Sequence, residues 1–143
     1  MTAKEYLQQI RKSDIKINQL IKEVGDLRKS ITFISGIDYS KDRVQSSPDS
    51  STGAMKTVER WYDLEREIER RIDAYVDMKD RIIKQIHGLS KAEYCEILYM
   101  RYVEYLRLEE IAVRMNYSYD RIKHLHGTAL QIFYNQFLKV STK

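Results

Sequence analysis

The sequence has few of the residues that interrupt helices or cross-link a chain. Its 143 residues include one proline, five glycines and one cysteine, Cys95. Scarce proline and glycine leave room for long helices, because these are the least favourable residues in a helix interior. A single cysteine excludes an intrachain disulfide and favours a reducing, cytoplasmic setting.

Long apolar runs are also missing. No stretch approaches the roughly 20 apolar residues that a membrane span needs. The first residues, MTAKEYLQQI, lack the apolar core of a signal peptide. We therefore expect a cytoplasmic protein with no membrane partner.

The motifs of catalysis and metal binding are not found either. There is no phosphate-binding loop, nucleophile elbow or metal-ligand spacing. His124 and His126 stand two residues apart and therefore point to different faces of a helix. Cys95 falls on an amphipathic segment and is predicted to be a small core residue. The sequence predicts a protein that is not an enzyme and holds no cofactor or metal.

The charge balance is weakly positive. The chain has 25 Lys and Arg against 21 Asp and Glu, a net charge of +4, which permits an anionic partner without requiring one. From Asn116 onward, cations outnumber acids, with Arg121, Lys123, Lys139 and Lys143 against Asp120. The end of the chain is therefore the natural place to look for an anion-binding surface.

Residues 1–87 show the pattern of two long helices. Thr2 and Glu5 fit a capping box that starts the first. Apolar residues then recur every seven positions in two columns, which are Ile10, Ile17, Val24 and Ile31, and Tyr6, Leu20, Leu27 and Ile34, with Ser13 filling the gap. A matching pair of columns follows later, formed by Trp61, Ile68, Tyr75 and Ile82, and by Leu64, Ile72, Met78 and Ile86.

Between the two patterns, residues 35–53 predict a Ser-rich loop. Its Arg43 and Gln45 have two interpretations, as contacts to phosphate or a partner, or as part of a polar linker. The whole of 1–87 then forms an antiparallel, coiled-coil-like helical hairpin. Two helices alone bury little apolar surface, so we expect this hairpin to oligomerise, to bind a partner, or to dock on the C-terminal part.

Residues 88–143 predict three further helices, at about 91–105, 108–115 and 119–138. Gly88 ends the preceding helix, and Ser90 with Glu93 fits a second capping box. The helical spacing of four apolar residues predicts that they are core, namely Tyr94, Leu98, Tyr102 and Tyr105. The fold class is therefore predicted as all-α, with a hairpin domain and a trihelical domain.

The last two helices fit a helix-turn-helix. The first inner face is Leu108, Ile111, Ala112 and Met115, and the second is Ile122, Leu125, Ala129 and Leu130. Between them the letters NYS supply the turn. Ser118 is placed to cap the second helix, and Asp120 lies in its first turn, where the helix dipole favours an acid.

The stretch LEEIAVRMNYSYDRIKHLHGTAL resembles the helix-turn-helix of sigma factor region 4. It differs from the usual pattern at Arg107, where a threonine cap is common, and at Tyr119, where a basic residue is common. The wider layout is similar to phage and prophage proteins of Gram-positive bacteria, including late transcription regulators of the RinA and ArpU type. This resemblance also includes the segment DRVQSS in the predicted loop.

The resemblance implies which residues face DNA. It puts Tyr119, Asp120, Arg121, Lys123 and His124 toward the groove, with Ser118 at a phosphate. The chemistry agrees best for Arg121, which can pair bidentately with a guanine edge, and for Lys123, which can neutralise a phosphate or reach a base.

The leading hypothesis is a phage-encoded, sequence-specific transcription regulator that binds double-stranded DNA. It acts as a homodimer or higher homo-oligomer, with host RNA polymerase as a further partner. Two alternatives stay open. One is a DNA-packaging protein like a terminase small subunit, or a replication accessory protein. The other is a structural or coiled-coil interaction protein that does not bind DNA, in which the trihelical domain docks on RNA polymerase or another protein.

Overall fold

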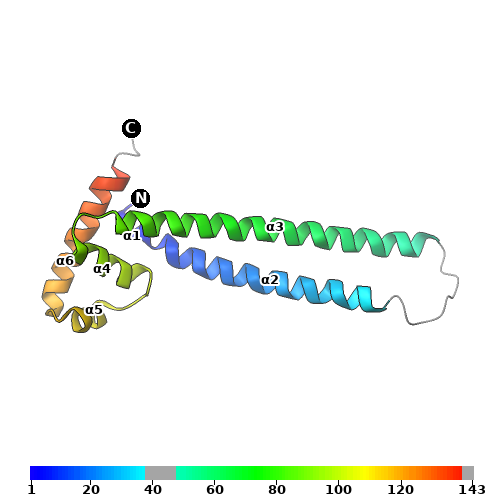
Figure 1. The fold of residues 1–143 in the computed structure, drawn as a ribbon, viewed down its shortest axis with the longest axis horizontal. Helices are drawn as coiled ribbons and strands as arrows, with labels where there is room; N and C mark the ends of the chain where they lie inside the picture. Colours follow the sequence, from blue (N-terminus) through cyan, green and yellow to red (C-terminus); the bar gives the residue numbers. More distant parts are fainter. Residues whose placement is uncertain (38–47, 140–143) are drawn as a thin grey trace. The chain divides into compact units, whose positions relative to one another are not determined.

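The computed structural model describes residues 1–37 and 48–139 (Figure 1). Every regular element among these residues is a helix, so the fold class is all-α, as the sequence predicts. The elements are α1 (Ala3–Leu7), α2 (Gln9–Ile37), α3 (Pro48–His87), α4 (Ala92–Tyr102), α5 (Leu108–Met115), α6 (Tyr119–Phe133) and a π-helical turn, η1 (Tyr134–Leu138). None of these described helices combines the length and the apolarity that a membrane crossing requires.

The chain divides into two compact units. We call Met1–Ile15 with Val76–Lys143 the terminal unit, and Lys16–Tyr75 the middle unit. The terminal unit takes in more of the chain than the predicted 88–143, because both ends of the chain contribute to one core. The buried residues of this shared core are Ala3, Leu7, Ile10, Ile82, Ile86, Leu89, Tyr94, Leu98, Tyr102, Ala129 and Phe133.

The start of the terminal unit follows the predicted capping box. The backbone N–H of Thr2 donates to the Glu5 carboxylate at 2.8 Å, and the Glu5 N–H donates to the Thr2 hydroxyl at 3.2 Å. Leu7 then lies fully buried. The Tyr6 hydroxyl donates to Gln85 at 2.8 Å, which ties the first turn to the end of α3.

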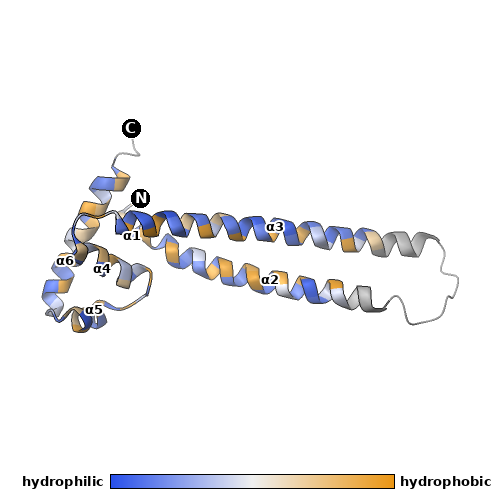
Figure 2. Ribbon diagram, viewed as in Figure 1, coloured by the Kyte–Doolittle hydropathy of each residue, from blue (hydrophilic) through white to orange (hydrophobic). Residues whose placement is uncertain are grey.

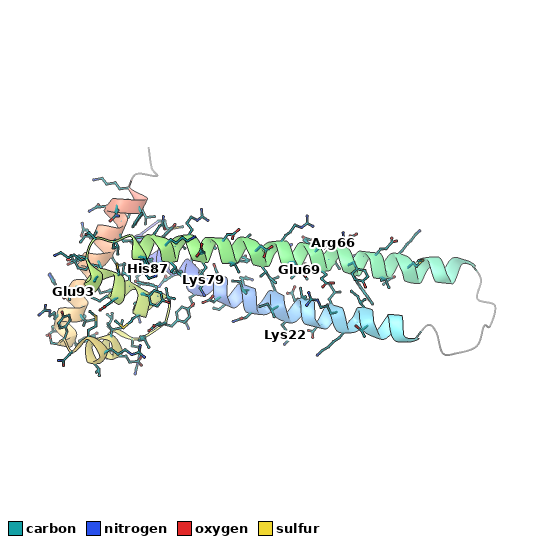
Figure 3. All side chains as sticks on the ribbon, in the orientation of Figure 1. Lys22, Arg66, Glu69, Lys79, His87 and Glu93 are labelled. Carbon is teal, nitrogen blue, oxygen red and sulfur yellow. The ribbon has the colours of Figure 1, made fainter. Side chains whose placement is uncertain are left out.

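The middle unit is a pair of helical segments from α2 and α3. Leu20, Val24 and Ile31 are buried along α2, as the seven-residue columns predict. Ion pairs join the two segments, since Arg28 contacts two α3 carboxylates, Glu65 at 2.5 Å and Glu69 at 2.9 Å. Figure 2 shows the apolar residues recurring along both helices, and Figure 3 labels Glu69.

Burial on the α3 side of the middle unit is only partial. Trp61, Ile68 and Ile72 are half-buried. Leu64 is 39% exposed, so its predicted place in the core is wrong. The physical reason is that one facing helix covers one stripe of its partner, and the apolar stripe of α3 is wider than that.

The predicted loop at 35–53 is shorter than expected at both ends. Helix α2 runs through Ile37, and α3 begins at Pro48. Proline suits the first position of a helix, because its missing N–H would have no helical partner there. The remainder, 38–47, lies outside the described residues, and with it Arg43 and Gln45.

The connection from α3 to α4 is partly as predicted. Gly88 follows the last residue of α3, with its N–H donating to the Lys84 carbonyl at 3.0 Å. The capping box at Ser90 and Glu93 is wrong, because the helix begins one residue later, with Lys91 at the cap position and no side-chain cap bond. The Glu93 carboxylate instead accepts a hydrogen bond from Tyr117.

Helix α4 ends at Tyr102, before the predicted limit of 105. Tyr94, Leu98 and Tyr102 are buried as predicted, but Tyr105 is 39% exposed. Its backbone has a left-handed φ of 61°, which places it beyond the helical register that predicted its burial. Its hydroxyl donates to Asp14 near the start of α2.

The last helix spans the predicted 119–138, with a change of winding at Phe133. The ring of Phe133 is fully buried and packs against Tyr6 and Phe137, with centroid separations of 6.0 and 5.0 Å. Cys95 is half-buried, and its thiol donates to the Leu89 carbonyl at 3.5 Å. Its place against the core agrees with the predicted packing role.

Candidate nucleic-acid interface

A tight turn joins α5 to α6 within the terminal unit. Asn116 ends α5 in the left-handed conformation, with φ 58° and ψ 42°. Asparagine adopts this conformation more readily than most residues. The N–H of Tyr117 donates to the Ala112 carbonyl at 3.0 Å, so one of the last open carbonyls of α5 is satisfied.

Ser118 is the N-cap of α6, as predicted. Its backbone is extended, and its hydroxyl accepts from the Arg121 N–H at 3.2 Å. Asp120 lies in the first turn, where its negative charge interacts favourably with the positive end of the helix dipole. The amino end of α6 is therefore fixed by local chemistry that the sequence already shows.

The inner face of α6 is anchored on a small separate core. Ile122 is fully buried there with Ile97, Ile111 and Ala112. Ala112 is 5% exposed, and its small side chain allows α5 and α6 to approach closely. Because this core is continuous across α4, α5 and α6, it fixes the rotation of α6 about its own axis.

That rotation decides which residues α6 presents to solvent. All six residues predicted to contact DNA are exposed, namely Ser118, Tyr119, Asp120, Arg121, Lys123 and His124. They cluster at the amino end of the helix, on both sides of the buried Ile122. Their positions are those that a major-groove helix uses, since its first residues contact the base edges.

Arg121 is held in place by an aromatic ring that the sequence reading missed. Its guanidinium carbon lies 4.1 Å from the centroid of the Tyr117 ring. Tyr117 is itself anchored, since its hydroxyl donates to Glu93 on α4 at 2.5 Å, a residue labelled in Figure 3. This hydrogen bond to Glu93 raises the pKa of Tyr117. Stacking leaves the edge of a guanidinium accessible for hydrogen bonds.

Lys123 has a weaker contact of the same kind. Its ammonium nitrogen lies 5.3 Å from the ring centroid of Tyr119. Tyr119 and Lys123 both belong to α6 and are four residues apart, which places their side chains on the same face of the helix. Tyr117 precedes the N-cap of α6, so its contact with Arg121 follows from the conformation of the turn and not from helical spacing.

The cations near this surface differ in whether an acid neutralises them. Arg107 pairs with Glu110 at 3.2 Å, and Arg114 pairs with Glu104 at 3.1 Å. Arg121 and Lys123 form no ion pair with any described residue. The uncompensated positive charge of α6 is thus concentrated on these two side chains.

The two histidines of α6 have different environments. His124 is exposed, whereas His126 is half-buried with its Nε2 3.0 Å from the Tyr102 hydroxyl. Burial, with the positive charges of Arg101 and Lys4, lowers the pKa of His126 to about 4. In the part of the chain that the structure describes, no three His, Cys, Asp or Glu side chains are grouped to hold a metal ion.

The chain has no match among the known proteins compared with it. Comparisons with family models, with curated proteins and with solved structures each give none.

Proposed function

We propose that this chain is a sequence-specific DNA-binding protein that regulates transcription, with α5 and α6 acting as a helix-turn-helix of the sigma region 4 type. This proposal is supported chiefly by the positions of Arg121 and Lys123, which lie exposed at the amino end of α6 and have no acid partner among the described residues. A helix in this position fits the major groove, where arginine reads guanine and lysine neutralises phosphate.

The proposal gives each exposed residue a separate role. Arg121 donates to a guanine edge, and Lys123 contacts a phosphate or a base. Ser118 donates to a phosphate, while Tyr119 and His124 make supporting phosphate contacts. Asp120 accepts from a cytosine amino group or serves only the helix dipole.

The resemblance in the sequence supplies the biological setting of the proposal. We infer a phage or prophage regulator of the RinA and ArpU type, in which host RNA polymerase is a further partner. Chemistry at α6 supports DNA binding without distinguishing a promoter from a packaging site. A gel shift that compares phage promoter fragments with packaging-site fragments separates these two uses.

The middle unit is proposed to make the protein a homodimer or higher oligomer. Apolar side chains remain exposed there, with Ile21 at 54%, Tyr62 at 47% and Leu64 at 39%. Covering such side chains with a second copy buries apolar surface, at about 25 cal/mol per Å². Light scattering at tens of micromolar protein is expected to give a mass at least twice that of the chain, and a monomer there contradicts this part of the proposal.

The test of DNA binding compares two variants with a matched control. Arg121→Ala is expected to weaken specific binding by about 1 to 3 kcal/mol. Lys123→Ala is expected to weaken binding to all sequences alike and to reduce its salt dependence. Lys22→Ala removes an exposed cation of α2 in the middle unit and serves as the control.

Genomic fragments retained by the purified protein supply the DNA for these gel shifts. Equal binding by the wild type and both α6 variants contradicts the assignment. Absence of any binding at low salt, where phosphate contacts are strongest, favours the interaction protein that does not bind DNA.

A further inference from the structure

A small pocket in the terminal unit lies away from the exposed face of α6. It has a volume of about 210 Å³ and lies between the first turns of α2 and the segment that leaves α4. Its lining residues are Gln8, Arg11, Lys12, Ile15, Arg101, Tyr102 and Tyr105. Three of these are cations, and the lining includes no acid.

The three cations of the pocket lie outside the ion pairs of the described residues. None of Arg11, Lys12 and Arg101 forms an ion pair with a described residue. Arg101 is also half-buried, and one of its guanidinium nitrogens donates to the Leu106 carbonyl at 2.9 Å. Removing a cation from water without a counter-charge costs free energy, so this site favours an anion.

A nearby acid does not cancel this charge. Asp14 lies beside the pocket, but its carboxylate is paired with Lys79 at 2.7 Å. The same carboxylate accepts from the Tyr105 hydroxyl. Lys79 compensates the negative charge of Asp14. Glu5 interacts electrostatically with Lys12, but its carboxylate accepts from the Thr2 N–H in the capping box. Arg11 and Arg101 therefore carry most of the positive charge of the site.

The aromatic wall of the pocket is fixed in an uncommon conformation. Tyr105 has a φ of 61°, which is unusual for a residue with a large side chain. Its ring lies under the Arg11 guanidinium, with 5.6 Å from the guanidinium carbon to the ring centroid. Strained backbone of this kind is found more often at ligand sites than elsewhere.

We propose that this pocket binds a phosphate group, with Arg11, Lys12 and Arg101 donating to its oxygens. Arginine suits this role because its planar donors match the geometry of a phosphate. The pocket is large enough for a phosphate with part of its ester group. Two sources present this chemistry, a free nucleotide and the backbone of DNA.

If the phosphate group belongs to DNA, the inference rests on the proposed function. If it belongs to a free nucleotide, the inference is independent of that function. Arg101 lies in the last turn of α4, and Tyr105 lies in the segment that connects α4 to the amino end of α5. In a helix-turn-helix, the first helix crosses the DNA backbone. A backbone phosphate in the pocket therefore extends the contact surface beyond α6.

The experiment measures binding of three probes at low salt, which are inorganic phosphate, adenosine monophosphate and a DNA duplex retained by the wild type. The variant combines Arg11→Gln with Lys12→Gln, and both residues are exposed, so the fold is expected to persist. The control combines Lys22→Gln with Lys29→Gln, which removes equal charge from exposed positions of the middle unit. A second variant, Arg101→Gln, tests the half-buried cation, with circular dichroism to confirm its folding.

Binding of a phosphate probe by the wild type is expected to weaken about tenfold or more in the pocket variant, since each lost charged hydrogen bond contributes about 1.5 to 3 kcal/mol. The control is expected to bind like the wild type. If adenosine monophosphate binds more tightly than phosphate and duplex affinity is unchanged in the variant, the source is a nucleotide. If duplex affinity falls and its salt slope drops by about two, the source is DNA.

Two results overturn the pocket proposal. One is that the wild type binds none of the three probes, and the other is that the pocket variant binds each of them as the control does. If duplex binding stays sensitive to Arg121→Ala while the pocket variant binds all three probes as the control does, the pocket proposal fails and the proposed function stands.

Discussion

The Arg121 guanidinium lies against the ring of Tyr117, 4.1 Å from its centroid, and Tyr117 is in turn hydrogen bonded to Glu93 on α4. The three residues form a chain of contacts from the α4 surface to the exposed face of α6. An arginine held in one orientation loses less conformational entropy when it binds. We therefore assign Tyr117 as the residue that positions Arg121.

Replacing Tyr117 with leucine is expected to weaken specific DNA binding about fivefold, because an exposed cation–π contact contributes about 1 kcal/mol. Tyr117→Phe keeps the ring and is expected to lose less. A double-mutant cycle with Arg121→Ala isolates the contact, and the expected coupling is about 0.5 to 1 kcal/mol. Strictly additive losses in the cycle contradict the positioning role.

The two candidate caps of the terminal unit are expected to differ sharply. Ser118→Ala removes the hydroxyl that accepts from the Arg121 N–H and is expected to cost about 1 kcal/mol. Ser90→Ala is expected to change stability by less than about 0.5 kcal/mol, because Lys91 is the cap residue of α4. Urea unfolding of both variants measures the difference. Equal losses indicate that Ser90 caps α4 in solution.

Removing the hydroxyl of Ser13 is expected to stabilise the protein. This side chain is fully buried, and its oxygen has no hydrogen-bond partner among the described residues. An unsatisfied buried hydroxyl costs about 1 to 3 kcal/mol, so Ser13→Ala is expected to raise the urea midpoint. Ser30→Ala is the matched control on the same helix, since the Ser30 hydroxyl is exposed and already donates to the Asp26 carbonyl. A lower midpoint for Ser13→Ala contradicts the expectation.

Acid is expected to destabilise the terminal unit through His126. Its pKa is about 4 in the folded chain against an ordinary 6.5, because burial disfavours the protonated ring. Between these values the unfolded chain binds more protons, so stability falls as the pH drops from 6.5 to 4. After discounting for partial exposure of the ring, the loss is about 1 to 2 kcal/mol.

The variant His126→Gln removes this titration while keeping an acceptor for the Tyr102 hydroxyl. Its stability is expected to fall less between pH 6.5 and 4 than that of the wild type. Thermal unfolding across this pH range measures the stability of both proteins. The carboxylates are the same in the two proteins, so their contribution cancels when the two stabilities are subtracted. Parallel curves for the two proteins indicate that His126 is protonated in the folded state.

Local chemistry made much of the fold predictable. The caps at Thr2 and Ser118 follow from residues three positions apart, and α5 was predicted to the residue. The predicted cap at Ser90 was wrong because the Glu93 carboxylate accepts a hydrogen bond from Tyr117, which lies 24 positions further along the chain. The predicted burial of Tyr105 was wrong because α4 ends at Tyr102, so Tyr105 does not continue its helical spacing.

The two candidate sites also differ in how far the sequence predicts them. The exposed face of α6 follows from helical periodicity and a short turn, so its residues were named from the sequence. The stack of Arg121 on Tyr117 was not predicted, because Tyr117 lies in the turn before α6, where helical spacing does not apply. The pocket between α2 and α4 was not predicted either, since Arg11 and Arg101 come together only through packing that no local pattern encodes.

The core of the terminal unit joins Ala3 and Leu7 to Phe133. More than 120 residues of sequence therefore separate side chains that pack in one core. Contacts of such long sequence separation slow folding and leave apolar surface open in the meantime. A fragment that begins at Gly88 lacks Leu7, Ile10, Ile82 and Ile86, so its α6 loses the core residues that surround Ala129 and Phe133.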